Sequence, residues 1–126
     1  MGVVVAAAIR RDGRVLVAQR AHPATLVGLW ELPGGKVEAG EQEMDALVRE
    51  CHEELGVILA VEERVGGDLD LGPDWVLRAY AARLLDREPQ PLEHLELRWL
   101  TCAELTQIAW VPGNERLVPA LCELLA

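Results

Sequence analysis

The sequence predicts an α/β fold in which a mixed sheet is layered between helices. Apolar runs typical of strands occur both before and after a central helical segment, which extends from Met44 to Leu55. A second helical segment occupies the C-terminus. Strands that flank one helix and are followed by another combine most simply into a sheet with helices on both faces.

The chain is expected to form one domain, residues 1–126. This length is sufficient for a single hydrophobic core, and the sequence contains no repeat, linker or low-complexity tract. No apolar run approaches the roughly 18 residues of a membrane span, and the N-terminus lacks the pattern of a secretion signal. We therefore expect a cytoplasmic protein with no membrane partner.

The charge of the chain restricts the partners that it can bind. With 12 basic and 21 acidic residues, its formal net charge at pH 7 is −9. Binding to polymeric nucleic acid depends on neutralising many phosphates, which an acidic chain does poorly. A small nucleotide that arrives with a metal ion remains a possible partner.

The three cysteines are expected to be thiols. Cys51, Cys102 and Cys122 are odd in number, far apart in the sequence and embedded in apolar patterns. This distribution argues against a disulfide framework and against a zinc site.

A β-hairpin is predicted at the N-terminus. Residues 3–9 and 15–20 are apolar runs, and Asp12-Gly13 between them is a hairpin-turn signal. Residues 21–29 contain a proline and a glycine and are expected to form a loop. The glycine pair within residues 32–36 predicts a turn whose backbone can approach a ligand closely.

The central helix is predicted from the spacing of its apolar residues. They recur at helical intervals and form a stripe that can face a core: Met44, Leu47, Val48, Cys51 and Leu55. Gly56 stands where a left-handed helix C-cap is expected.

Three further strands follow the central helix. Residues 58–71 have alternating apolar positions broken by Gly66-Gly67, which indicates one bulged strand or two short strands. Residues 75–85 and 95–100 predict the other two strands, and the proline-containing stretch 86–91 between them predicts a surface loop.

Two helices are predicted near the C-terminus. Thr101 to Glu104 fits a capping box that opens a short helix. The last helix should begin near Asn114 and continue through Leu124. Pro119 would remove a backbone hydrogen bond from its interior, so this helix either begins later or is kinked.

The central helix carries an unusual group of acids. Glu50, Glu53 and Glu54 are spaced i, i+3 and i+4, so their carboxylates lie on one flank. A solvated helix face is the ordinary explanation for such a group. Because like charges at this spacing destabilise a helix, a bound cation is the alternative, and an oxygen-only ligand set suits Mg²⁺ or Mn²⁺.

The residues around these acids favour the cation. The spacing G-x5-E-x7-R-E-U-x-E-E-x-G-U, with U an apolar residue, is matched without a miss by Gly35, Glu41, Arg49, Glu50, Cys51, Glu53, Glu54, Gly56 and Val57. This pattern resembles the Nudix box, and nine specified positions in a fixed register make it a specific signal. Residues 30–38 are similar to the lead-in of MutT-type nucleotide-pool sanitisers and of relatives that act on cytidine triphosphates. Residues 93–99 and 110–115 continue the similarity, whereas residues 61–83 share only scattered features with these proteins.

The resemblance implies a Nudix-type α/β/α sandwich in which the box forms a loop, a helix and a loop. It also implies an enzyme, because a binding module or scaffold would have no reason to keep every acid of the box. The implied reaction is attack of water on a nucleoside triphosphate, releasing a monophosphate and pyrophosphate, with divalent ions that neutralise phosphate oxygens and acidify water.

The resemblance also implies roles for individual residues. Glu50 and Glu54 are expected to bind the metal with the carbonyl of Gly34 or Gly35, and Glu53 to be a further ligand or the proton acceptor. Glu93 is expected to join the metal when nucleotide binds, from a mobile loop. Arg49 would hold Glu53 in its catalytic orientation. The alternative is that Arg49 and Glu53 form an ordinary ion pair on the helix surface. Glu41 would steady the loop.

Three residues are expected to contact the substrate. Arg20 and Lys36 are candidates for phosphate contacts, although Arg20 also fits a solvated strand end. The amide of Asn114 suits a purine edge, and a helix N-cap is the competing role. MutT-type proteins use such an asparagine to read 8-oxoguanine, so 8-oxo-dGTP is the expected substrate. CTP, dCTP and 5-methyl-dCTP are the alternatives, and ADP-ribose or nucleotide sugars are less favoured. The protein should act as a monomer or homodimer in nucleotide-pool sanitising, a form of DNA repair.

Overall fold

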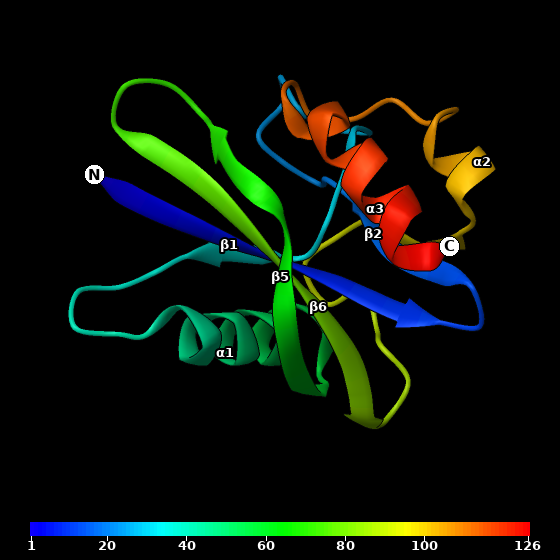
Figure 1. The fold of residues 1–126 in the computed structure, drawn as a ribbon, viewed down its shortest axis with the longest axis horizontal. Coiled ribbons are helices and arrows are strands. Elements are labelled where there is room, and N and C mark those ends of the chain that lie inside the picture. The colour runs from blue at the N-terminus through cyan, green and yellow to red at the C-terminus, as the bar shows by residue number, and fades with distance from the viewer.

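A computed structural model describes residues 1–126 (Figure 1). The strands are β1 (Gly2–Arg11), β2 (Arg14–Gln19), β3 (Trp30–Glu31), β4 (Gly34–Lys36), β5 (Ile58–Asp70), β6 (Trp75–Asp86) and β7 (Glu96–Leu100). The helices are α1 (Glu43–Leu55), α2 (Cys102–Leu105), the 3₁₀ turn η1 (Asn114–Leu117) and α3 (Val118–Leu125). None of the helices is long and apolar enough to cross a membrane.

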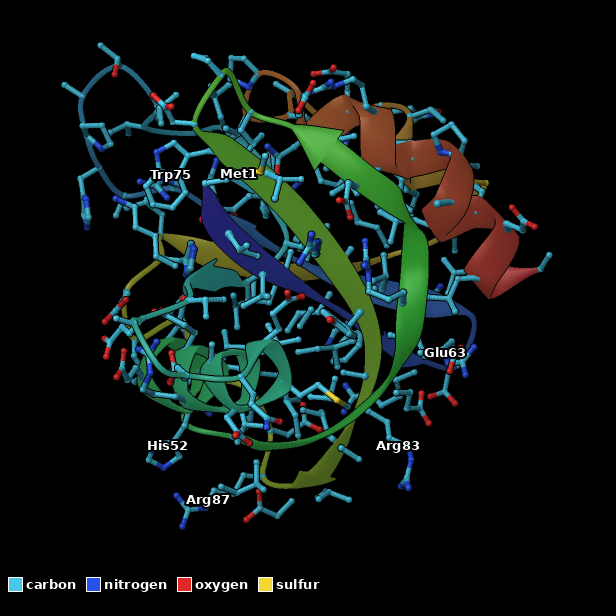
Figure 2. The ribbon with its side chains drawn as sticks, turned by 60° about the vertical axis from the view of Figure 1, so that its left-hand side comes forward. Met1, His52, Glu63, Trp75, Arg83 and Arg87 are labelled. Carbon is cyan, nitrogen blue, oxygen red and sulfur yellow. A yellow bond between two sulfur atoms is a disulfide. The ribbon has the colours of Figure 1, made fainter.

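The seven strands form a mixed sheet, as predicted. The strand order is β3-β2-β1-β6-β5, with β4 paired to β1 and β7 paired to β2. β1 and β6 run parallel, from Gly2 opposite Trp75 to Ile9 opposite Ala82, and the other pairs are antiparallel. Figure 2 accordingly shows Trp75 beside Met1.

Helices cover both faces of the sheet and create two hydrophobic cores. Side chains alternate along β1, so that Val5, Ala7 and Ile9 pack toward α1. Ala6 and Ala8 belong to the other core, with residues from α2, η1 and α3. Figure 1 shows α1 on one side of the sheet and α2 and α3 on the other. The α/β/α arrangement is thereby confirmed.

Most local predictions are confirmed. Asp12 and Gly13 form the hairpin turn, both with positive φ, which a tight hairpin requires. Gly56 is the left-handed C-cap of α1, with φ of 71°. The capping box of Thr101 and Glu104 is present. The last α-helix begins later than Asn114, at Val118, so Pro119 lies in its first turn, where proline is tolerated.

Two local expectations are wrong. Residues 34–36 form the short strand β4 rather than a turn, because the glycines let this segment approach and pair with β1. Met44 is 43% exposed and is not part of the buried stripe of α1. Leu47, Cys51 and Leu55 are buried as predicted, and Ala46 and Glu54 complete the buried face of α1.

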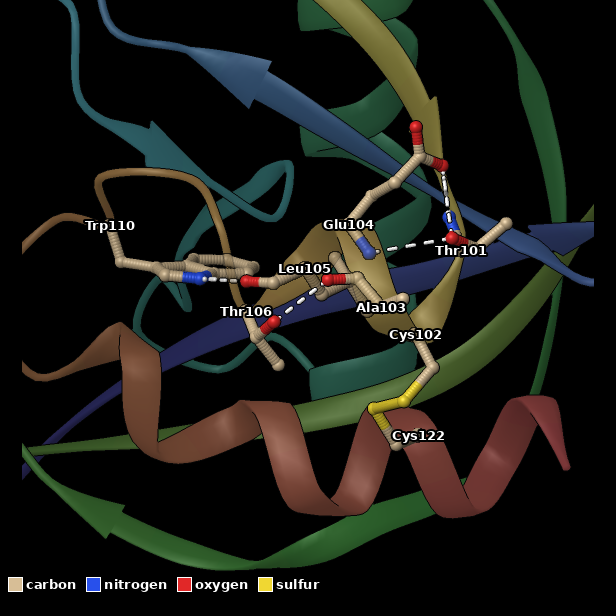
Figure 3. The surroundings of a disulfide bond; sticks show 8 residues. All are labelled: Thr101, Cys102, Ala103, Glu104, Leu105, Thr106, Trp110 and Cys122. Atoms are coloured by element: carbon tan, nitrogen blue, oxygen red, sulfur yellow. Dashed lines mark hydrogen bonds between the residues drawn. A yellow bond between two sulfur atoms is a disulfide. The ribbon is translucent and has the colours of Figure 1, made fainter.

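The expectation of three free thiols is also wrong. Cys102 and Cys122 form a disulfide that joins α2 to α3 (Figure 3). Only Cys51 is a free, buried thiol. The two cysteines are 20 positions apart, but the chain between them folds back and places the two helices against each other. Distance along the sequence therefore said little about their distance in space.

Reduction of this disulfide should destabilise the protein. Loop-closure entropy for a separation of 20 residues corresponds to about 3 kcal/mol of unfolding free energy. We expect Cys102→Ser to lower the unfolding free energy by about this amount in chemical denaturation without reductant. Wild type treated with dithiothreitol should match the variant. Equal stability of wild type with and without reductant would show that the cross-link contributes nothing.

Candidate active site

One cavity of about 410 Å³ contains most of the candidate residues. Its charged and polar lining comes from β3, β4, α1, η1 and two connecting segments: Arg20, His22, Glu31, Lys36, Glu50, Glu54, Glu93, His94 and Asn114. Its apolar lining consists mainly of Val4, Ala6, Leu32, Leu71, Leu77, Val111 and Pro112. The cavity therefore combines an acidic region with an apolar one.

The cavity lies where the strands change partners. The end of β1 pairs with β2 near the turn that joins them. The first half of β1 pairs with β4 instead. The glycines of β4 permit close packing there. A Cβ atom on Gly34 would lie 2.0 Å from the carbonyl oxygen of Val5, and one on Gly35 would lie 2.4 Å from Cδ of Glu50. The lack of side chains thus allows the Glu50 carboxyl group to lie against the backbone of Gly35.

Arg49 organises the acids on one side of α1. Its Nε donates to Glu41 at 2.8 Å, and its Nη1 lies 3.0 Å from Glu50 and 3.5 Å from Glu53. The Arg49 hydrogen bonds, helped by the backbone N–H of Glu38, lower the pKa of Glu41 to about 2. Arg49 also donates to the carbonyl of Lys36 at 3.2 Å. It therefore connects α1 to β4 and to the segment that follows β4, a wider role than the expected pairing with Glu53.

Glu54 is a buried acid next to other acids. Only 5% of the residue is exposed. Burial, reinforced by the nearby charges of Glu31, Glu50 and Glu93, raises the pKa of Glu54 to about 9. A carboxyl group held in this environment gains a large stabilisation of its charged form if a cation is brought close to it.

The lining fits a hard divalent cation. Glu50, Glu54 and Glu93 offer oxygen ligands on the cavity wall, and the backbone of Gly35 lies against Glu50. Mg²⁺ and Mn²⁺ prefer such ligands. The chain alone does not bring three acidic, histidine or cysteine groups into a ready metal cage. This arrangement agrees with an ion that keeps waters and takes further oxygens from a substrate.

Two basic side chains lie at this acidic region. Nη1 of Arg20 is 3.3 Å from both carboxyl oxygens of Glu31, and its Nε donates to the carbonyl of His22. The ammonium group of Lys36 lies 4.9 Å from the centre of the Trp75 ring. Both side chains line the cavity, where they can partly offset the charge of an anionic substrate.

Backbone pairing brings Asn114 to the wall of the cavity. Trp30 accepts a hydrogen bond from Val111 and donates one to Ala109, so this segment extends along β3. The chain then turns, and Asn114 is 8% exposed. The N-cap of η1 is Gly113 and no side chain caps the turn, so the competing N-cap role for Asn114 is wrong. Its amide remains free to bind a ligand.

The family follows from comparison with known proteins. A family model described as the NUDIX domain matches residues 1–121. The chain belongs to the Nudix family. Over 126 residues it is 50% identical to a Mycobacterium tuberculosis protein named "Putative 8-oxo-dGTP diphosphatase 2", with 98% of this chain and 89% of that protein covered. This family membership, together with a relative named as a diphosphatase, makes the protein a Nudix hydrolase.

Other Nudix proteins match over similar lengths. The chain is 38% identical to the CTP pyrophosphohydrolase of Escherichia coli, covering 98% of this chain and 93% of that protein. The solution structure of the E. coli ORF135 protein superposes with a TM-score of 0.84 at 38% identity, covering 100% of this chain and 91% of that one. A MutT Nudix hydrolase from Burkholderia pseudomallei superposes with a TM-score of 0.75 at 34% identity, covering 95% of each chain.

The Nudix fold brings most of the expected site residues together. The residues that line the cavity are Arg20, Gly34, Gly35, Lys36, Glu50, Glu54, Glu93 and Asn114. Arg49 and Glu53 do not line it, and the Glu53 side chain is 51% exposed. Their predicted roles remain predictions.

Two cavity residues were not identified from the sequence. Glu31 and His94 meet at 3.0 Å although they are 63 positions apart. Glu31 stands next to the glycine-rich segment, a position that could have indicated its importance. No sequence signal indicated that His94 would be its partner.

Proposed function

We propose that this Nudix hydrolase is a Mg²⁺- or Mn²⁺-dependent nucleoside triphosphate pyrophosphohydrolase that prefers 8-oxo-dGTP. Water would attack phosphorus, and the products would be 8-oxo-dGMP and pyrophosphate. The proposal is supported by the acidic lining of the cavity, by the free Asn114 amide on its wall and by the name of the Mycobacterium tuberculosis relative. Such an activity would remove an oxidised precursor from the nucleotide pool, and we propose that a monomer or homodimer performs it.

The acidic region is suited to the phosphates. Glu50, Glu54 and the backbone of Gly34 or Gly35 would hold the cation, and Glu53 would be a further ligand or accept the proton. A divalent cation there would offset phosphate charge and make water more acidic. Arg49 holds Glu50 in place through a 3.0 Å contact. We expect Arg20 and Lys36 to bind phosphate oxygens.

Asn114 is the observation that carries the choice of base. The amide has one donor group and one acceptor, and the cavity that it lines also contains the apolar side chains of Leu71, Leu77 and Val111. A planar base would lie among these aliphatic groups with its polar edge toward Asn114. 8-Oxoguanine has an N7–H donor beside the O6 acceptor, whereas unmodified guanine has two acceptors on that edge and would leave one function of the buried amide unpaired.

A second candidate is hydrolysis of CTP, dCTP or 5-methyl-dCTP. The 38% identity with the E. coli CTP pyrophosphohydrolase favours it. Comparison of kcat/KM for 8-oxo-dGTP, dGTP, dCTP and 5-methyl-dCTP tests both candidates. We expect 8-oxo-dGTP to give the highest value by at least about tenfold, which corresponds to 1.4 kcal/mol of discrimination. A preference for the cytidine nucleotides would transfer the assignment to the second candidate.

Removing the Asn114 amide should change selectivity. We expect Asn114→Ala to reduce the preference for 8-oxo-dGTP over dGTP and dCTP by at least about tenfold, because a buried hydrogen-bonding group is lost. The thermal unfolding temperature should change little, since the amide caps no helix. Gln107→Ala, which removes an exposed amide outside the cavity, is the control. Unaltered selectivity in Asn114→Ala would exclude base reading by this residue.

A further inference from the structure

The His94 side chain is buried in an unusual environment. It is 5% exposed, and its Nε2 lies 3.0 Å from Oε2 of Glu31 and 3.7 Å from Oε1 of Glu54. Because a carboxylate accepts hydrogen bonds, Nε2 is the donor in the short contact with Glu31. The other ring nitrogen, Nδ1, is buried and has no hydrogen-bond partner.

This environment is not one that stability alone would select. Burying a polar nitrogen without a partner costs free energy, and an apolar side chain of similar volume would avoid that cost. Buried groups left unsatisfied in native proteins call for another explanation. His94 lies on the wall of the candidate active site, so a role in that site is the explanation consistent with its position.

Main-chain hydrogen bonds fix the backbone on both sides of Glu93 and His94. The N–H of Leu92 donates to the carbonyl of Glu54 at the end of α1, and the N–H of Leu95 donates to the carbonyl of Gln19 at the end of β2. Glu93 and His94 are the two residues between these fixed points. A ring held by Glu31 therefore restricts the backbone from which the Glu93 carboxylate projects.

Glu31 links the same ring to the basic side of the cavity. Its carboxyl oxygens lie 3.3 Å from Nη1 of Arg20. A continuous set of contacts thus runs from Arg20 through Glu31 to His94, and it ends beside Glu54. Moving the imidazole would disturb the expected phosphate contact and the expected metal ligand together.

We propose that His94 is a positioning residue. Its Nε2 donates to Glu31, and this contact keeps Arg20 and Glu93 correctly placed relative to each other where the phosphates would bind. This role rests on the proposed pyrophosphohydrolase function. It assigns no contact between His94 and the substrate. Its effect should appear mainly in kcat, because the arrangement of reacting groups is altered more than nucleotide binding.

Two substitutions of His94 separate this role from simple packing. A Gln side chain can place its amide nitrogen where Nε2 lies, whereas an Asn amide reaches only the position of Nδ1. We expect His94→Asn to lower kcat for 8-oxo-dGTP at least tenfold and to change KM less than threefold. His94→Gln should restore most of the lost kcat. His52→Asn, the same change at an exposed histidine of α1 that Figure 2 shows at the surface, should match wild type.

A second measurement keeps the test decisive if the Asn variant does not fold. Glu31→Ala removes the acceptor that holds the ring without changing His94 itself, so it should reproduce the loss of kcat. Wild-type kcat in folded His94→Asn or in Glu31→Ala would overturn the positioning role, as would equal losses in the Asn and Gln variants. Absence of pyrophosphate release by wild type from every nucleotide would instead overturn the proposed function.

Discussion

Glu54→Gln is expected to lower kcat by at least about 10³-fold, and Glu50→Gln should have a similar effect. Each substitution removes one charge from the group proposed to hold the divalent cation, whose contribution to such a reaction amounts to several kcal/mol. Pyrophosphate release at saturating nucleotide and Mg²⁺ measures the effect. Glu63→Gln, which removes an exposed acid of β5 seen at the surface in Figure 2, should be fully active. Full turnover by Glu54→Gln in the presence of EDTA would refute the assignment of the site.

The fold should survive this substitution, and the metal-free protein should become more stable. Folding raises the pKa of Glu54 from its ordinary value of 4.5 to about 9. Between these pH values the folded protein holds a proton that the unfolded chain has lost, so the unfolding free energy decreases as pH rises. Glu54→Gln removes this dependence. In EDTA we expect the variant to unfold at a higher temperature than wild type at pH 8, with a smaller difference at pH 5.

Glu93→Gln is the second substitution with a large expected effect. Glu93 lines the cavity and contributes to the high pKa of Glu54, which places its charge close to the other acids. We expect kcat to fall at least about tenfold while Mn²⁺ binding to the nucleotide-free protein is nearly unchanged, because Glu93 is proposed to bind the ion only with substrate present. Steady-state kinetics and titration calorimetry with Mn²⁺ separate the two effects. An unchanged kcat would exclude a catalytic role for this carboxylate.

The structure refines how Glu93 would act. Its segment forms no helix or strand, yet main-chain hydrogen bonds from Leu92 and Leu95 attach both ends to α1 and β2. Any backbone movement of Glu93 toward a bound ion is therefore confined to the two residues between these attachment points. The expectation of a mobile loop is not needed for the predicted kinetic effect.

Elements with strong local signals were predictable from the sequence. The hairpin at Asp12-Gly13 depends on residues that tolerate positive φ, and the end of α1 at Gly56 depends on the same property. β4 was missed because a strand of two glycines and a lysine has no alternating side chains, and its pairing with β1 is a tertiary contact. The disulfide between Cys102 and Cys122 was missed for the same reason, since the packing of α3 against α2 brings its partners together.

The site was predictable to the extent that it is contiguous in the sequence. Glu50 and Glu54 share one helix, so their spacing indicated that both carboxylates would bind the same cation. The same spacing placed Glu53 with them, but in the structure Glu53 lies outside the cavity, because α1 directs Glu54 toward the sheet. The contact of His94 with Glu31 joins residues 63 positions apart and depends on the complete fold.

The central claim is that this Nudix hydrolase releases pyrophosphate from 8-oxo-dGTP by means of the acidic region around Glu54. ³¹P NMR of the nucleotide incubated with wild-type protein and Mg²⁺ tests it most directly, because the two products have distinct signals. We predict 8-oxo-dGMP and pyrophosphate in equal amounts, and no reaction with EDTA or with Glu54→Gln. Release of orthophosphate with formation of 8-oxo-dGDP, or an undiminished reaction in EDTA, would contradict the claim.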